Sequence, residues 1–126
     1  MTRTLLFLAV AAAAGAGLAA AAPVADTERP RIKALPSTAQ VGRPVRLLAL
    51  ASDDSRAFYL GGSVFRGTTN LFSVRSDYIR QVKRPLHYYV QFSQPELARG
   101  TYRFCLRAFD RAGHRSGISC STLRVR

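Results

Sequence analysis

Apolar and polar residues alternate with a period of two along most of the chain after Pro30, and no stretch keeps helical spacing over several turns. Val45, Leu47 and Ala49 fall on one side of the clearest alternation, and Arg46 falls on the other. Gly, Pro, Asn, Asp and Ser interrupt the pattern roughly every eight to twelve residues, which is the turn spacing of sandwiches and barrels. The pattern therefore predicts an all-β domain built of short strands.

We expect seven or eight strands, depending on whether residues 78–82 form a short edge strand. The strands cover residues 31–35, 45–51, 57–66, 71–76, 78–82, 86–92, 101–109 and 118–125. Gly61 and Gly62 interrupt the third of them, which predicts a bulge or kink there. Short strands joined by turns at these intervals favour an antiparallel β-sandwich.

The beginning of the chain has a different pattern. Arg3 precedes an uninterrupted run of apolar and small residues at positions 5–18, and residues 19–22 are all alanine. A charged start, an apolar centre and a small-residue end are the three parts of a secretory signal peptide. We predict cleavage near Ala20 or Ala21. The alternative is an uncleaved membrane anchor, since the apolar segment is about 20 residues long and can span a bilayer.

The expected organisation therefore has three parts. They are a signal peptide at residues 1–21, a flexible linker at 22–30 and a β-sandwich domain at 31–126. Export places the protein outside the cell or in the cell envelope, with no transmembrane segment after cleavage.

Two cysteines, Cys105 and Cys120, are the only thiols of the chain, and alternation puts both on the outer face of their strands. If they lie opposite each other, every inward position of one strand meets an inward position of the other. This register pairs Tyr102 with Leu123, Phe104 with Ser121, Leu106 with Ser119 and Ala108 with Gly117. Cysteines directly opposite in neighbouring strands are within reach of a disulfide, which an exported protein can form. The alternative is two independent buried thiols.

The stretch "YRFCLRAFDRAGHRSGISCSTLRV", with "LARGT" before it and "VGRPVRLLALASDDS" upstream, resembles bacterial secreted immunoglobulin-like or fibronectin type III-like β-sandwich modules. The resemblance covers residues 30–125 and implies an immunoglobulin-like sandwich with an adhesive, spacer or accessory role. Two positions depart from the family pattern. His114 replaces the usual Asn of the last turn, and Arg56 replaces a Gly that often follows Asp-Asp-Ser.

The chain is strongly basic, with 19 Lys and Arg against 7 Asp and Glu and a formal net charge of +12. Removal of the signal segment takes away one charge, Arg3, so that the +12 becomes +11. Four arginines fall on one outward face of the last two strands, namely Arg103, Arg107, Arg124 and Arg126. They are candidates for binding an anionic cell-envelope polymer or polysaccharide, with nucleic acid bound only non-specifically. A solvated surface produced by compositional bias explains the charge equally well.

Three carboxylates form a weak candidate metal site. Asp53, Asp54 and Asp110 lie in turns that an immunoglobulin-like topology brings to one end, where oxygen ligands could bind Ca²⁺. Arginines of the same loops oppose this, and Asp at the first position of a turn bonds its own backbone. We therefore predict turn-forming roles for these residues, and no metal or cofactor.

The remaining chemistry-bearing residues match no catalytic motif. His87 and His114 are not in metal-ligand spacing, and phosphate-loop and nucleophile-elbow sequences are absent. Either Tyr88 or Tyr89 must point outward, because the two are adjacent in a strand. We predict a secreted or cell-surface binding or spacer module without catalytic activity. The alternative is a small secreted enzyme or enzyme inhibitor, and the oligomeric state is left open.

Overall fold

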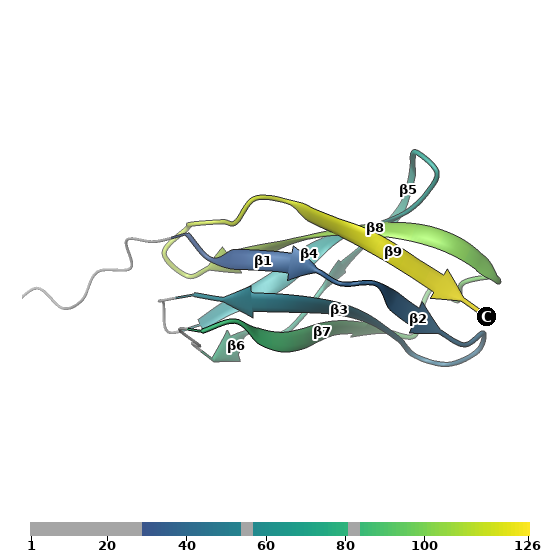
Figure 1. Ribbon diagram of the computed structural model, residues 1–126, viewed down its shortest axis with the longest axis horizontal. Helices are drawn as coiled ribbons and strands as arrows, with labels where there is room; N and C mark the ends of the chain where they lie inside the picture. Colours follow the sequence, from purple (N-terminus) through teal and green to yellow (C-terminus); the bar gives the residue numbers. More distant parts are fainter. Residues whose placement is uncertain (1–28, 54–56, 81–83) are drawn as a thin grey trace, which may run out of the picture.

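The computed structural model describes residues 29–53, 57–80 and 84–126, which form two β-sheets packed face to face (Figure 1). The strands are β1 (Arg31–Ala34), β2 (Ser37–Ala39), β3 (Val45–Ser52), β4 (Ala57–Arg66), β5 (Thr69–Arg75), β6 (Ile79–Arg80), β7 (Leu86–Phe92), β8 (Gly100–Asp110) and β9 (Ser119–Val125). No helix occurs among these residues, so the all-β prediction is confirmed. The predicted signal peptide lies outside the described residues, and no described part of the chain forms a helix that could cross a membrane.

The two sheets have the strand arrangement of an immunoglobulin-like sandwich. Sheet A has the order β1-β3-β7, and sheet B has the order β2-β9-β8-β4-β5, with β6 also paired to β4. All pairs are antiparallel except β2 with β9, which are parallel. The predicted immunoglobulin-like β-sandwich is confirmed. It has nine strands instead of seven or eight, and its one parallel pair was not expected because the three-residue β2 was not predicted.

The chain changes sheet between β1 and β2. Pro36 separates the two strands, and β1 pairs with β3 before β2 pairs with β9. Two serine hydroxyls bond backbone groups at this crossing. Ser37 Oγ accepts a hydrogen bond from the Leu48 N–H at 2.9 Å, and Ser119 Oγ accepts one from the Ala34 N–H at 2.8 Å. These two hydrogen bonds give backbone donors an acceptor where the regular strand pairing ends.

Strand β4 continues through Gly61 and Gly62 in regular register, and its irregularity lies between Val64 and Phe65. The predicted bulge at the two glycines is therefore wrong. Gly62 has a different role, because a Cβ built there would lie only 1.9 Å from the Cys105 carbonyl oxygen. Glycine at this position lets β4 and β8 approach each other closely.

The core lies between the sheets and is formed by the inward positions of both. Its fully buried large side chains are Phe58, Phe104, Leu47, Leu60, Leu106, Leu123, Val64 and Val90. At one end of the core, the Tyr102 hydroxyl donates a 2.7 Å hydrogen bond to the Ala98 carbonyl. This contact at the start of β8 is the tyrosine corner found in immunoglobulin-like sandwiches.

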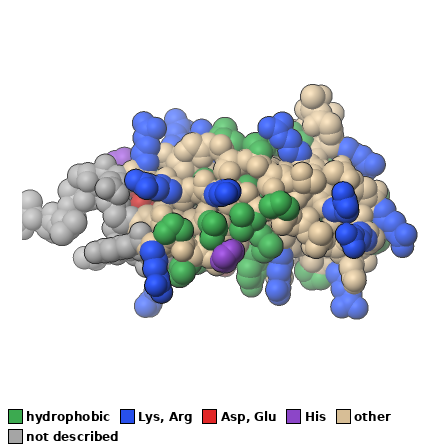
Figure 2. All heavy atoms as spheres, viewed as in Figure 1, with side chains coloured by type: hydrophobic (Ala, Val, Ile, Leu, Met, Phe, Trp, Pro, Cys, Tyr) green, Lys and Arg blue, Asp and Glu red, His purple; other side chains and the backbone are tan. Residues whose placement is uncertain are grey.

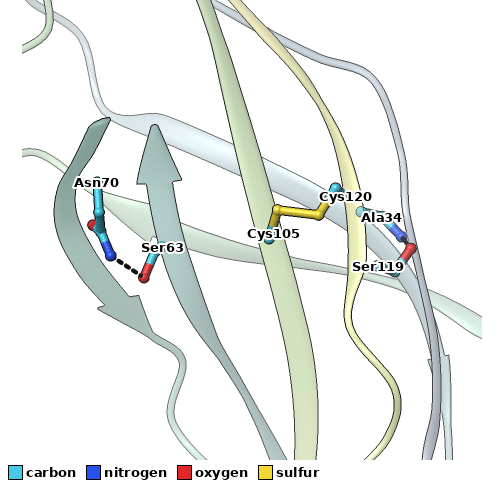
Figure 3. The surroundings of a disulfide bond; sticks show 6 residues. All are labelled: Ala34, Ser63, Asn70, Cys105, Ser119 and Cys120. Carbon is cyan, nitrogen blue, oxygen red and sulfur yellow. Dashed lines mark hydrogen bonds between the residues drawn. A yellow bond between two sulfur atoms is a disulfide. The ribbon is translucent and has the colours of Figure 1, made fainter. Parts of the chain in front are cut away.

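Cys105 and Cys120 form a disulfide between directly opposite positions of β8 and β9, as predicted (Figure 3). Their Cα atoms are 4.0 Å apart. The predicted register holds from Tyr102 to Leu106, but Ala108 does not pair with Gly117. Instead the backbone of Ala108 bonds both the N–H and the hydroxyl of Ser116, which leaves Gly117 exposed.

Candidate functional site

Four arginines lie at outward positions of the sheet B strands β5, β8 and β9, and no described acidic side chain lies at an outward position of these three strands. We call this surface the arginine face and define it by Arg75 on β5, Arg103 and Arg107 on β8, and Arg124 on β9. They point outward because they alternate with residues that pack on the core. Of the described acidic residues, Asp53 and Glu96 are in loops and the side chain of Asp110 is buried. Asp77 is exposed just after β5 and lines a recess that Arg75 also lines.

The structure divides the four arginines predicted from the sequence. Arg103 and Arg124 are diagonal neighbours across the β8–β9 ladder, with Cα atoms ~7–8 Å apart. The disulfide lies between this pair and Arg107. Arg126 follows the end of β9 and lines a separate recess with Arg43. The predicted group is thus one pair and two single arginines.

Arg75, which the sequence did not identify, lies beside Arg107. Gly61 on β4 pairs with Arg75 on one side and with Arg107 on the other, so the three residues form one row across the sheet. Two strand spacings separate the arginine Cα atoms, which is about 10 Å. The chain has no side chain at the middle of this row, and the surface is hollowed there.

We call this depression the Gly61 hollow; it has a volume of about 480 Å³. Its apolar walls include Tyr59, Phe109 and Ile118, its hydroxyls come from Ser63 and Ser73, and its charges come from Arg75 and Arg107. Cys105 also lines it, so one wall is held by the disulfide (Figure 3). The described lining contains two cations and no anion.

Aromatic rings hold one of the two guanidinium groups in place. The Arg75 Cζ lies 3.9 Å from the centre of the Tyr59 ring, which in turn stacks on Phe109 at 4.9 Å with an interplanar angle of 15°. Tyr78 meets Tyr59 edge-on, and Arg111 lies 4.4 Å over Tyr78. Stacking occupies the face of a guanidinium and leaves its in-plane N–H donors available.

Arg107 contributes a second kind of donor. Its Nε atom is buried and has no hydrogen-bond partner among the described residues. A buried donor without a partner is costly, and a bound acceptor would relieve that cost. The hollow is therefore lined by the stacked guanidinium of Arg75, by the side chain of Arg107, whose Nε–H is buried and unpaired among the described residues, and by apolar walls.

The three carboxylates of the candidate metal site, Asp53, Asp54 and Asp110, have separate outcomes in the structure. Asp110 accepts a hydrogen bond from the His114 N–H at 2.8 Å and lies 3.2 Å from the His114 Nδ1, so its carboxylate closes its own turn. Asp53 is buried, and Asp54 lies outside the described residues. The described part of the chain contains no group of three or more His, Cys, Asp or Glu side chains that could hold a metal.

Sheet A has a different outer surface. Tyr89 is exposed beside Leu48, and Arg46 lies over its ring at 4.7 Å. Figure 2 shows hydrophobic side chains gathered on the side of the molecule that carries β1 and β3, with Lys and Arg side chains dispersed around them. Tyr88 turns inward and meets Phe58 edge-on at 5.8 Å, and burial raises its pKa. Of the two adjacent tyrosines, Tyr89 is thus the outward one.

Comparison with known proteins supports the fold. The chain matches no family model and no curated protein sequence. Among solved structures it is similar to an R347E mutant of the SrpA adhesin from Streptococcus sanguinis, with 23% identity, a TM-score of 0.52 and 81% of this chain covered. The match covers 60% of the adhesin chain. A PKD domain of an M14-like peptidase from a Thermoplasmatales archaeon aligns with 77% of this chain and 92% of its own at 13% identity, with a TM-score of 0.44. The protein is an immunoglobulin-like β-sandwich.

Proposed function

We propose that this protein is a non-catalytic binding module of the cell surface or extracellular space, and that it binds anionic envelope polymers through the arginine face. The observation that carries the proposal is the charge of that face, which has four arginines and no described acid. Unneutralised arginines on a flat sheet attract polyanions, and each guanidinium can bond two oxygens of a phosphate, sulfate or carboxylate group. The similarity in fold to a protein named an adhesin agrees with a surface role.

Compositional bias is the competing explanation, and it makes a different prediction. If the charge has no specific role, any two exposed arginines contribute equally to binding a polyanion. If the arginine face binds, neighbouring arginines on that face contribute more than arginines elsewhere. A matched pair of double variants therefore separates the two explanations.

The test uses immobilised dextran sulfate at ~50 mM and ~200 mM salt, because release of counterions makes such binding fall steeply with salt. Arg103→Gln/Arg124→Gln removes the diagonal pair. Arg31→Gln/Arg84→Gln removes the same charge from exposed positions outside sheet B. Arg43 and Arg66 are unsuitable controls, since Arg43 lies beside Arg126 and Arg66 bonds the Tyr102 hydroxyl.

We expect the arginine-face variant to lose roughly tenfold in affinity and to show a shallower salt dependence, while the control loses about twofold. Equal losses in the two variants would reject the proposal and leave only non-specific attraction.

A further inference from the structure

The Gly61 hollow has the features of a specific subsite within the broader arginine face. Two arginines approach it from opposite sides of one glycine, and its remaining lining is aromatic, aliphatic and hydroxyl-bearing. A flat basic surface for polymers does not need such a recess. The recess instead suits a compact group that brings negative charge together with a ring or polyol body.

We propose that the Gly61 hollow binds a phosphate monoester carried on a sugar or polyol. This inference rests on the proposed function, because it names the charged group that one part of the arginine face recognises.

The charge of the hollow favours a monoester over a carboxylate. The lining contributes two positive charges and no negative one. A phosphate monoester carries about −1.5 to −2 at neutral pH and presents three acceptor oxygens. It can therefore neutralise both arginines and accept from the two guanidinium groups in different directions. A single carboxylate would leave one positive charge unmatched.

The arrangement of donors supports the same ligand. Arg75 is stacked on Tyr59, which fixes the guanidinium and leaves its edge free to donate. Arg107 lines the hollow, and its Nε–H lacks an acceptor among the described residues. Because that atom is buried, a phosphate oxygen would accept from it once the Arg107 side chain turns toward the ligand. Beside the phosphate, Ser63 and Ser73 offer hydroxyls to the hydroxyl groups of a sugar or polyol.

Glucose 6-phosphate is a suitable probe, with glucose, glucose 6-sulfate and glucuronate as comparisons. Binding is followed by the ¹H–¹⁵N NMR shifts of the Gly61 amide and the Arg107 Nε–H, which report the hollow itself. We expect glucose 6-phosphate to bind at ~1 mM or tighter and to shift both signals. Glucose should produce no shift, and the sulfate and the carboxylate should bind at least about fivefold more weakly.

The pH dependence of binding tests whether the hollow prefers the doubly charged form of the phosphate. The second pKa of a phosphate monoester is about 6, so a change from pH 7.5 to pH 5 should weaken glucose 6-phosphate binding by roughly tenfold. Glucose 6-sulfate has no such titration and serves as the control. Identical pH profiles for the two ligands, or glucuronate binding as tightly as the phosphate, would overturn the proposal.

Variants test the two arginines separately. Arg75→Gln and Arg107→Gln should each weaken glucose 6-phosphate binding by about tenfold or more, while Arg103→Gln/Arg124→Gln should change it by less than about twofold. Arg107→Lys keeps the charge but loses the Nε–H, and it should recover little of the loss. Wild-type affinity in either Gln variant, with circular dichroism showing a native fold, would contradict the assignment.

Failure of this inference can be distinguished from failure of the proposed function. Dextran sulfate binding that depends on Arg103 and Arg124, without any glucose 6-phosphate binding, would reject the hollow alone. Glucose 6-phosphate binding that depends on Arg75 and Arg107, with equal dextran sulfate losses in the two double variants, would reject the polymer-binding face alone.

Discussion

Replacement of Gly62 by alanine tests the close approach of β4 and β8 directly. The added Cβ would lie 1.9 Å from the Cys105 carbonyl oxygen, 2.9 Å from its carbonyl carbon and 3.0 Å from the Leu106 Cα. All three contacts are with backbone atoms, so no side-chain rotation relieves them. The two strands would have to separate by about 1 Å even to reach a 3.0 Å contact, which distorts the central β4–β8 ladder.

Such overpacking costs roughly 1–3 kcal/mol and occasionally more, and a backbone clash belongs at the upper end. We therefore expect Gly62→Ala to lower the free energy of unfolding by about 3 kcal/mol, against a total of ~5–15 kcal/mol for a small domain. For a domain of this size the melting temperature should fall by roughly 12–24 °C. Far-UV circular dichroism with urea and heat measures both quantities, since the chain has no tryptophan for fluorescence.

Gly61→Ala is the matched control, one position away in the same strand. Its Cβ would meet Phe109, Tyr59 and the Val74 carbonyl at 3.4–3.7 Å, which are ordinary contacts. Neither Gly61 nor Gly62 has a positive φ, so alanine is not strained at either site. Because alanine costs less conformational entropy than glycine, this control should be neutral or stabilised by about 0.5–1 kcal/mol. Unfolding free energies within ~0.5 kcal/mol of each other for the two variants would refute the reasoning.

Three further predictions concern stability. Cys105→Ser and Cys120→Ser should each lower the unfolding free energy by ~2–4 kcal/mol. The double variant should lose little more, because both changes remove the same disulfide bond. Two titratable thiols in the purified wild-type protein would contradict this prediction. Tyr102→Phe should cost about 1 kcal/mol in urea unfolding by removing the hydrogen bond to the Ala98 carbonyl, and an unchanged midpoint would exclude that contribution. Ser37→Ala leaves the backbone donor at the sheet crossing without its acceptor and should cost ~1–2 kcal/mol, with faster amide exchange there, whereas Ser37→Thr should retain most of the stability.

The alternation of apolar and polar residues correctly predicted the strands in which many consecutive positions follow it. In β8 and β9, four inward positions alternate with outward ones, and only one register satisfies both strands and the two cysteines. The register beyond Leu106 was not predictable in this way, because Ser116 replaces a regular strand partner with its hydroxyl. Strand β2 is only three residues long, too short to show a period.

The arginines of the candidate site were predicted only in part, because the register between strands is predictable only where the alternation is regular. Arg103 and Arg124 belong to adjacent strands whose register the sequence fixes. Arg75 lies on β5, and its place beside Arg107 depends on a β4–β5 pairing that contains an irregularity between Val64 and Phe65. The alternation alone does not predict which residues pair beyond such an irregularity, because one extra residue changes every later pairing.

Both the disulfide and the burial of the inward side chains oppose a shift of β8 against its neighbours. The free energies that they contribute are different. A slip by one residue would turn Arg103 and Arg107 toward the core, and burying an unpaired charge costs several kcal/mol for each ion. The disulfide contributes ~3 kcal/mol through its effect on the unfolded chain. Burial is therefore the larger effect, and it keeps the arginines outward without the bond.

It follows that Cys105→Ser/Cys120→Ser, although less stable, should keep its arginines in place wherever it remains folded. Under conditions in which circular dichroism shows the native spectrum, its glucose 6-phosphate affinity should lie within about twofold of the wild-type value. The serine at position 105 changes one wall of the hollow by little, since Ser and Cys have similar size. A folded double variant that has lost this binding, while the Gly61 amide signal of the free protein has moved, would show instead that the disulfide positions the arginines.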